Sequence, residues 1–210
     1  MAEKTVTEES LDELVAASAA YQLLARLWLR EVDIAMLRLI SQSALAECFT
    51  LDTVPSGRDS DLIDHLAGDY CQLFIGPAGH LPPFQSVWEA GQFQSSAAAS
   101  MSQFIDVTGY DDSSQGTMAD HLGVQLGVMG LISRQCADRQ SNLEELSQLM
   151  ELKRAYFMRH LTWTEELLQQ AIRKAESEFY ESVLLTTGWA LECEHESHSI
   201  NRTSIIGGCD

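Results

Sequence analysis

The sequence predicts an all-α protein, a helical bundle of about eight or more helices in two halves joined by a hinge. Apolar residues recur at three- and four-residue steps along most of the chain, which is the period of an amphipathic helix. Capping-box patterns begin several of these runs, for example Ser10-Leu11-Asp12-Glu13 and Ser141-Asn142-Leu143-Glu144. No segment shows a credible strand pattern, and 210 residues are enough to bury a substantial core.

The expected helices follow in order from these signals. The first covers residues 10–30 and the second 33–49, each with one apolar face. Ser60 can cap the third helix, and Gly76-Pro77 ends it because proline removes a backbone donor and restricts the residue before it. The remaining helices are expected at about 92–107, around 122–132, at 141–159, from about 162 and from about 177.

Two segments interrupt the helical pattern. Residues 76–91 hold three of the four prolines and predict an ordered, partly extended loop. Residues 109–116 are small and polar, which is typical of a flexible linker. The chain is therefore expected to divide into an N-terminal helical half (1–108), a hinge (109–117), a C-terminal helical half (118–193) and a polar, flexible tail (194–210).

Charge and composition argue against several classes of function. The net charge of −18 repels a nucleic-acid backbone, so no nucleic-acid partner is expected. The same charge would attract a basic peptide, although acidic surfaces often serve only solubility. The N-terminus lacks the basic and apolar regions of a signal peptide, and no apolar stretch approaches the roughly 20 residues of a membrane span. We therefore expect a cytoplasmic chain without membrane insertion.

An acidic, all-helical, metal-dependent enzyme is the alternative that the sequence leaves open. Its possible ligands lie near the C-terminus, in the run Glu192-Cys193-Glu194-His195-Glu196 and at His198. Glu192 and His195 have the spacing of half a helical di-iron site, but the chain has no second Glu-x-x-His, and a solvated helix end is the simpler interpretation. The sequence also contains no nucleophile elbow, phosphate-binding loop or C-x-x-C pair, so we expect no catalytic residue, no metal and no resident cofactor.

Two further segments carry more aromatic, proline and ionisable residues than a simple core needs. One is Tyr70-Cys71-Gln72-Leu73-Phe74-Ile75-Gly76-Pro77, followed by Pro82-Pro83-Phe84-Gln85-Ser86-Val87-Trp88. The other is Asp120-His121-Leu122. On the physics of the residues alone, Asp120 is an N-cap or first-turn acid of a helix, and His121 is a surface or half-buried residue. Leu73 and Phe74 have the helical spacing of core residues.

In this order, the two segments resemble the signature of the TorD/DmsD/NarJ family of redox-enzyme maturation chaperones, particularly its TorD and DmsD branches. The first matches the family's aromatic-x-x-Leu-Phe-x-Gly-Pro and Pro-Pro-x-x-Ser-x-aromatic patterns. The second matches the end of its Glu-Pro-x-Asp-His motif, with Thr117 and Met118 in place of Glu-Pro. The resemblance spans about residues 11–191, because the family's C-terminal pattern is matched by His160-Leu161, Trp163, Phe179-Tyr180 and Trp189.

The resemblance implies an all-helical chaperone, a monomer or a domain-swapped homodimer, that catalyses no reaction. Its implied partners are the twin-arginine signal peptide and the apoprotein of a molybdoenzyme, whose maturation before export it assists. We expect the aromatic residues and the glycine-proline turn to form the apolar part of one cleft, in which Asp120 accepts hydrogen bonds from an arginine and His121 helps to orient the peptide. The residues assigned to this signal-peptide site are Tyr70, Leu73, Phe74, Gly76, Pro77, Pro83, Ser86, Trp88, Asp120 and His121.

Overall fold

The computed structural model describes residues 11–51, 59–111 and 116–206, with the side chains described as far as 198. The predicted capping residue Ser10 lies outside these ranges, as does most of the centre of the expected hinge. The described residues form nine α-helices and no strand, which confirms the all-α prediction. The helices are α1 (Leu11–Leu29), α2 (Ile34–Gln42), α3 (Asp59–Tyr70), α4 (Gln85–Ala90), α5 (Ser96–Thr108), α6 (Leu122–Asp138), α7 (Leu143–His160), α8 (Thr164–Ile172) and α9 (Glu178–Ile206).

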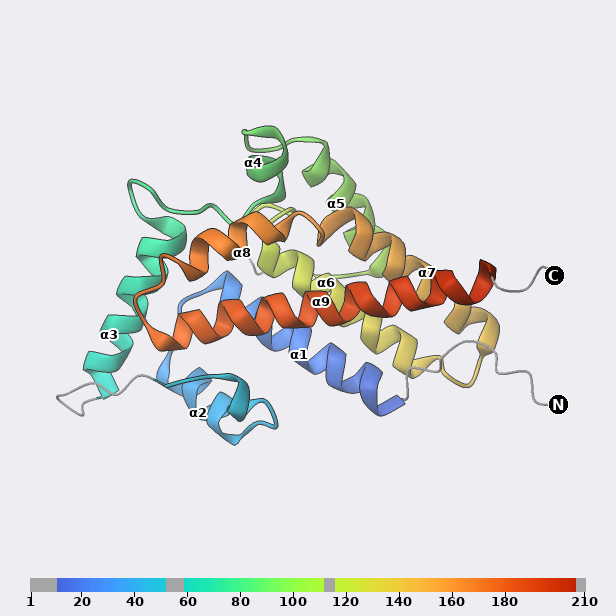
Figure 1. The fold of residues 1–210 in the computed structure, drawn as a ribbon, viewed down its shortest axis with the longest axis horizontal. Helices are drawn as coiled ribbons and strands as arrows, with labels where there is room; N and C mark the ends of the chain where they lie inside the picture. Colours follow the sequence, from blue (N-terminus) through green and yellow to red (C-terminus); the bar gives the residue numbers. More distant parts are fainter. Residues whose placement is uncertain (1–10, 52–58, 112–115, 207–210) are drawn as a thin grey trace.

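The helix α6 lies at the centre of the molecule (Figure 1) and is buried on nearly every side. It is apolar around most of its circumference, as expected of a helix that other helices surround. Its most extensive contact is with α1. Two glycines allow this approach: a Cβ atom on Gly123 would lie 3.0 Å from the backbone oxygen of Ala25, and one on Gly130 would lie 2.7 Å from the side chain of Gln22. A third, Gly127, lies against the ring of Tyr110, which follows α5.

The longest helix, α9, crosses the face of the molecule alongside α1 (Figure 1). A buried carboxylate fixes its start, because Asp69 of α3 accepts hydrogen bonds from the amide and hydroxyl groups of Ser177, at 2.9 and 2.6 Å. Ser177 in turn accepts from the amide of Tyr180, as an N-cap residue does. None of the helices in the described ranges is both long and apolar enough to cross a bilayer.

Three expected boundaries were wrong in the first half of the chain. The second helix ends at Gln42 rather than Phe49, because Ser43 turns back and its amide and hydroxyl both bond to the carbonyl of Ile40; a short 3₁₀ turn, η1 (Ala46–Cys48), follows. The expected loop 76–91 contains α4, which ends at Gly91 with a left-handed φ of 66°. Accordingly α5 begins at Ser96, capped by Ser95, and not at residue 92.

Two expectations fail in the second half. His121, not Asp120, caps α6, because its Nδ1 atom accepts a hydrogen bond from the amide of Gly123 at 3.0 Å. The chain beyond Glu194 does not begin a polar tail, since α9 continues as a helix to Ile206 and both Glu194 and His198 are buried. Glu194 can be buried here because it pairs with Lys153 of α7 and with His198 one turn further along α9. A local reading of the sequence does not reveal the contact with Lys153.

Candidate functional site

The two segments that stand out in the sequence meet in the structure. Phe84 and His121 form an isolated antiparallel β-bridge. On either side of it, the amide of Gln85 donates to the carbonyl of Asp120 at 3.1 Å, and the amide of Leu122 donates to the carbonyl of Pro83 at 2.8 Å. The start of α4 and the start of α6 are therefore joined through their backbones, although about 36 residues of chain separate them.

Asp120 is the charged residue at this junction, and its side chain is fully buried at 0 % exposure. One carboxylate oxygen, Oδ2, accepts a hydrogen bond from the amide of Ser86 at 2.9 Å. Within the described part of the chain the other oxygen, Oδ1, is buried and has no hydrogen-bond partner. A buried carboxylate oxygen without a donor is unfavourable, so this atom can bind an incoming hydrogen-bond donor.

His121 is a neutral, buried neighbour of Asp120. Burial lowers the pKa of His121 from 6.5 to about 4, against the opposing effect of the Asp120 charge. Its Nδ1 atom is an acceptor for the amide of Gly123, so a neutral ring carries its proton on Nε2. The ring stands edge-on to Phe84, with 4.9 Å between centroids, and Phe84 stands edge-on to Phe93 at 5.4 Å. Phe93 is 52 % exposed, so an accessible aromatic surface adjoins the buried Asp120.

A network of buried polar side chains holds α4 against the second half of the molecule. The side-chain oxygen of Gln85 accepts from Gln125 of α6 at 2.8 Å and lies 2.9 Å from Nδ1 of His160, which ends α7. The other ring nitrogen of His160 lies 3.0 Å from the hydroxyl of Ser100 in α5. The indole nitrogen of Trp163 donates to the oxygen of Gln125 at 3.0 Å. We call these five residues the Gln85 network.

The proton positions in the Gln85 network follow from these partners. Since an amide oxygen can only accept, His160 donates from Nδ1 and accepts the Ser100 hydroxyl at Nε2, which is a neutral tautomer. Burial lowers the pKa of His160 from 6.5 to about 4, and the charge of Arg159 lowers it further, with Asp120 opposing. The network therefore stays uncharged at neutral pH and connects four helices by hydrogen bonds alone.

The expected aromatic residues of the first segment lie in the core. Tyr70 is 4 % exposed, and its hydroxyl donates to the carbonyl of Trp28 at 2.9 Å; burial raises its pKa to about 12. Phe74 packs on Trp28 and on Tyr70, with centroids 4.8 and 5.3 Å apart. Leu73 is fully buried. These three side chains therefore pack in the core beneath the region, and of the three only Tyr70 also lines one of the two surface hollows described below.

The remaining predicted residues shape the chain between the two segments. A π-helical turn, η2 (Cys71–Ile75), ends where the amide of Gly76 donates to the carbonyl of Cys71 at 2.7 Å. A side chain at Gly76 would place its Cβ 3.2 Å from that carbonyl, so glycine fits this close approach. Pro77 is exposed, whereas Pro83 and Ser86 are buried. Trp88 is half-buried, and its indole nitrogen donates to the carbonyl of Pro82 at 2.7 Å.

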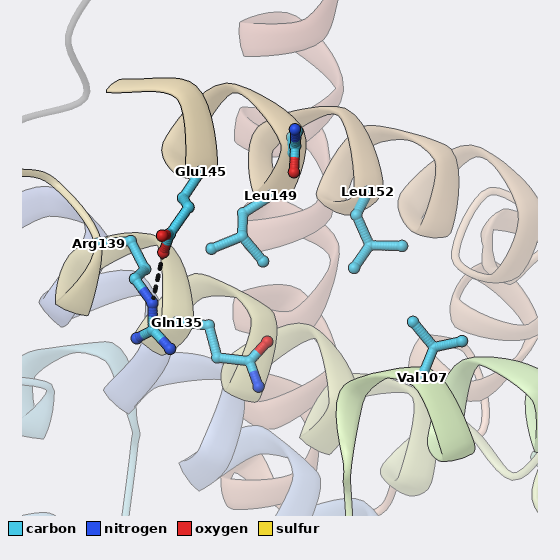
Figure 2. Close-up of a pocket in the computed structure, with 7 residues that line it drawn as sticks. Val107, Gln135, Arg139, Glu145, Leu149 and Leu152 are labelled. Carbon is cyan, nitrogen blue, oxygen red and sulfur yellow. Dashed lines mark ion pairs between the residues drawn. The ribbon is translucent and has the colours of Figure 1, made fainter. Parts of the chain in front are cut away.

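The surface has two hollows near α3, α5, α6 and α7. Neither is lined by Asp120 or His121. One, of about 550 Å³, is lined by Tyr70 together with Ile63, Ile75 and the turn between α1 and α2. The other, of about 400 Å³, lies between α5, α6 and α7, where Val107, Leu149 and Leu152 form its apolar part (Figure 2). An ion pair between Arg139 and Glu145, 3.0 Å long, closes one end of it. The two motif segments thus converge, but the hollow beside Tyr70 does not extend to Asp120.

The geometry near the C-terminus does not favour the metal-dependent alternative. Oε1 of Glu194 lies 3.0 Å from Nζ of Lys153 and 3.0 Å from Nε2 of His198. An ammonium group at that distance would repel a metal ion bound to the same carboxylate. Across the described ranges, no group of three or more His, Cys, Asp or Glu side chains is arranged to hold a metal ion.

Sequence reasoning missed part of the junction. Gln85 lies inside the first segment and Gln125 inside an apolar helix, and neither was singled out, although a glutamine among glycine, valine and leucine at 122–129 is a usable signal for a buried polar contact. Phe93 was also missed, because its role depends on the tight turn at Gly91 that brings it next to Phe84.

Comparison with known proteins places this architecture in a family. The family model described as nitrate reductase delta subunit matches residues 39–169, which include α4, α6 and both motif segments. A crystal structure of a candidate redox enzyme maturation protein from Archaeoglobus fulgidus is similar at a TM-score of 0.50 and 15 % sequence identity, over 93 % of this chain and 99 % of that chain, and this likeness shows the shared fold. The search of curated proteins gave no match. The chain therefore belongs to the nitrate reductase delta subunit family, the NarJ/TorD-type maturation chaperones of redox enzymes, as the sequence predicted.

Proposed function

We propose that this chain is a cytoplasmic chaperone that binds the twin-arginine signal peptide of a molybdoenzyme and assists the maturation of its apoprotein before export, without catalysing a reaction. Membership of a maturation chaperone family supports the general role. The junction of Pro83–Gln85 with Asp120–Leu122 supports the specific one, because it unites a buried anion with aromatic side chains. A twin-arginine leader combines a basic and an apolar part, so it needs both features.

The observation that carries the proposal is the unpartnered Oδ1 atom of Asp120. A guanidinium group donates strong, charge-assisted hydrogen bonds to carboxylates, and it would satisfy this oxygen. Because Asp120 is fully buried and its carboxylate bonds to the amide of Ser86 in α4, an arginine can reach it only when the neighbouring chain moves aside. The proposed mechanism is therefore an opening of the α4–α6 junction. The peptide's arginine would then donate to the carboxylate of Asp120 in place of the amide of Ser86.

The apolar part of the leader would bind to the aromatic residues on the outside of the junction. Phe93 is more than half exposed, Phe84 and Trp88 are half-buried, and all three belong to the segment around α4. Tyr70, Leu73 and Phe74, which were expected to contact the peptide, would instead support the opened conformation from the core. Whether the chain acts as a monomer or as a domain-swapped dimer through the 109–117 hinge stays a prediction.

The proposal is tested by calorimetric titration with synthetic leaders of molybdoenzymes from the same organism, starting with one encoded beside this gene. We expect one leader to bind, and replacement of its arginine pair by alanine to weaken binding by about tenfold or more. Asp120→Asn keeps the shape of the side chain and should weaken binding by a similar factor. Asp106→Asn removes the same charge from the exposed side of α5 and should leave affinity nearly unchanged.

The test becomes specific when Asp120→Asn is combined with the leader whose arginine pair is replaced by alanine. If Asp120 contacts the arginine pair, Asp120→Asn should have little further effect on the peptide that lacks the pair, because the interaction is already lost. Fully additive effects of the two changes would contradict the assigned contact. Thermal unfolding of Asp120→Asn shows whether the variant remains folded at the temperature of the titration.

A further inference from the structure

Two large apolar side chains lie exposed on α9, the helix that crosses the outside of the molecule (Figure 1). Leu185 is 53 % exposed and Trp189 is 62 % exposed. They are four residues apart, so they lie one turn from each other on the same side of the helix. Exposed leucine and tryptophan at neighbouring positions form an apolar strip that a folded chain usually covers.

The other sides of α9 are covered by the chain itself. Towards η1, the hydroxyl of Ser182 accepts from the amide of Thr50 and the hydroxyl of Thr186 donates to the carbonyl of Cys48, both at 3.1 Å. Towards α1, the hydroxyl of Thr187 accepts from the indole of Trp28 at 3.0 Å. Leu184 is fully buried. The strip of Leu185 and Trp189 is therefore a separate, outward side of α9.

Three exposed glutamates lie before and after this apolar strip along α9. Glu181 precedes Leu185 by four residues, and Glu192 and Glu196 follow Trp189 by three and seven, so all three lie on the same side of α9 and are exposed. Among the ion pairs of the described residues, none neutralises these three glutamates. We call the five residues Glu181, Leu185, Trp189, Glu192 and Glu196 the α9 face.

We propose that the α9 face is a docking surface for a basic, amphipathic helix of a partner protein. The apolar strip would bury the apolar side of such a helix, and lysine or arginine side chains beside it would pair with the glutamates. A spacing of one helical turn between Leu185 and Trp189 suits the rows of side chains on a second helix. A second copy of this chain would bring like charges together, and an anionic lipid surface would be repelled, so the charge of the face selects a cationic partner.

This surface does not depend on the proposed peptide site at Asp120. No residue of the α9 face belongs to the α4–α6 junction or to the Gln85 network. Variants of the α9 face should therefore leave leader binding unchanged, and Asp120→Asn should leave binding at the α9 face unchanged. The two proposals can fail separately.

The probe for the test is a designed helical peptide of about 18 residues, or five turns, with a leucine strip flanked by lysines. Its binding is measured by fluorescence anisotropy. We expect Trp189→Ala to weaken binding by about tenfold, because a buried aromatic anchor dominates small interfaces. Val107→Ala removes an apolar side chain that is 72 % exposed on α5 and should have no effect.

The contribution of charge is tested with two triple variants of equal net charge. Changing Glu181, Glu192 and Glu196 to glutamine should weaken binding by about tenfold and reduce its dependence on salt. The control changes Asp64, Asp106 and Glu151, which are exposed on α3, α5 and α7, to the matching amides, and should weaken it less than about threefold. Equal losses in both triple variants, or no loss with Trp189→Ala, would show nonspecific attraction and overturn the proposal. Self-association or binding to phosphatidylglycerol vesicles that Trp189→Ala abolishes would assign the face to another occupant and also overturn it.

Discussion

Lys153, Glu194 and Tyr21 show how single residues join distant parts of the chain. The Lys153–Glu194 pair connects α7 to α9 with both side chains almost fully buried, at 0 % and 5 % exposure. Tyr21 of α1 donates to the other oxygen of Glu194 at 3.4 Å. Burial raises the pKa of Glu194, but the nearby imidazole of His198 and the ammonium group of Lys153 lower it more, so the pKa lies below its usual value. Glu194 is therefore a carboxylate in the folded protein.

Removing one partner of this pair should destabilise the protein strongly. Lys153→Met leaves Glu194 buried without its cation, and we expect the free energy of unfolding, measured by urea titration, to fall by about 3 kcal/mol. Arg134→Met is the control, because it removes an exposed pair with Asp138 on α6 and should change stability by less than about 0.5 kcal/mol. Adding Glu194→Leu to Lys153→Met should recover part of the loss. A loss below about 1 kcal/mol for Lys153→Met alone would contradict the account.

At the scale of elements, the α1–α6 contact depends on the absence of side chains at two positions of α6, Gly123 and Gly130. Gly123 is the more constrained of the two, since a Cβ atom there would lie 2.5 Å from Cγ of Leu29 as well as close to the backbone of α1. Gly130 faces only the flexible side chain of Gln22, which can move. In contrast, a Cβ atom on Gly68 of α3 would meet nothing within 4 Å.

Alanine substitution of these glycines should separate packing from helix propensity. Gly123→Ala forces the two helices apart and should lower the free energy of unfolding by about 2 kcal/mol. Gly68→Ala should raise it by about 0.5–1 kcal/mol, because alanine favours the helical backbone and meets no neighbour. Both values come from chemical denaturation followed by circular dichroism. An unchanged or increased stability for Gly123→Ala would show that α1 and α6 do not approach as closely as described.

The elements also show how far sequence reasoning reaches. The helical periodicity that predicts an all-α chain depends on local spacing, and it locates α1, α6 and α7 well. It misses α4, which has six residues and follows three prolines, and it misses the burial of Glu194, which depends on a lysine 41 positions earlier. Asp120 and His121 were found because they belong to a family motif, whereas Gln85 and Gln125 act through hydrogen bonds to distant residues that no local pattern encodes.

At the scale of the whole molecule, helices from the beginning, middle and end of the chain pack together. The first helix, α1, lies against both α6 and α9, and the α4–α6 junction attaches the motif segments of the two halves to one another. Leader binding at this junction should therefore involve residues of both halves at once. The net charge of −18 adds a long-range attraction for cationic partners. This attraction should raise the rate of association at either proposed surface, and the rate should fall as the salt concentration rises.

The central claim is that the leader binds at the α4–α6 junction, and amide hydrogen exchange of the full chain with and without a bound leader tests it most directly. The account predicts that binding slows exchange in residues 83–93 and 118–123 together, because both segments contact the peptide or close over it. Asp120→Asn should reduce this protection, and Asp106→Asn should not. Protection confined to other parts of the chain, with both segments exchanging as in the free protein, would contradict the claim.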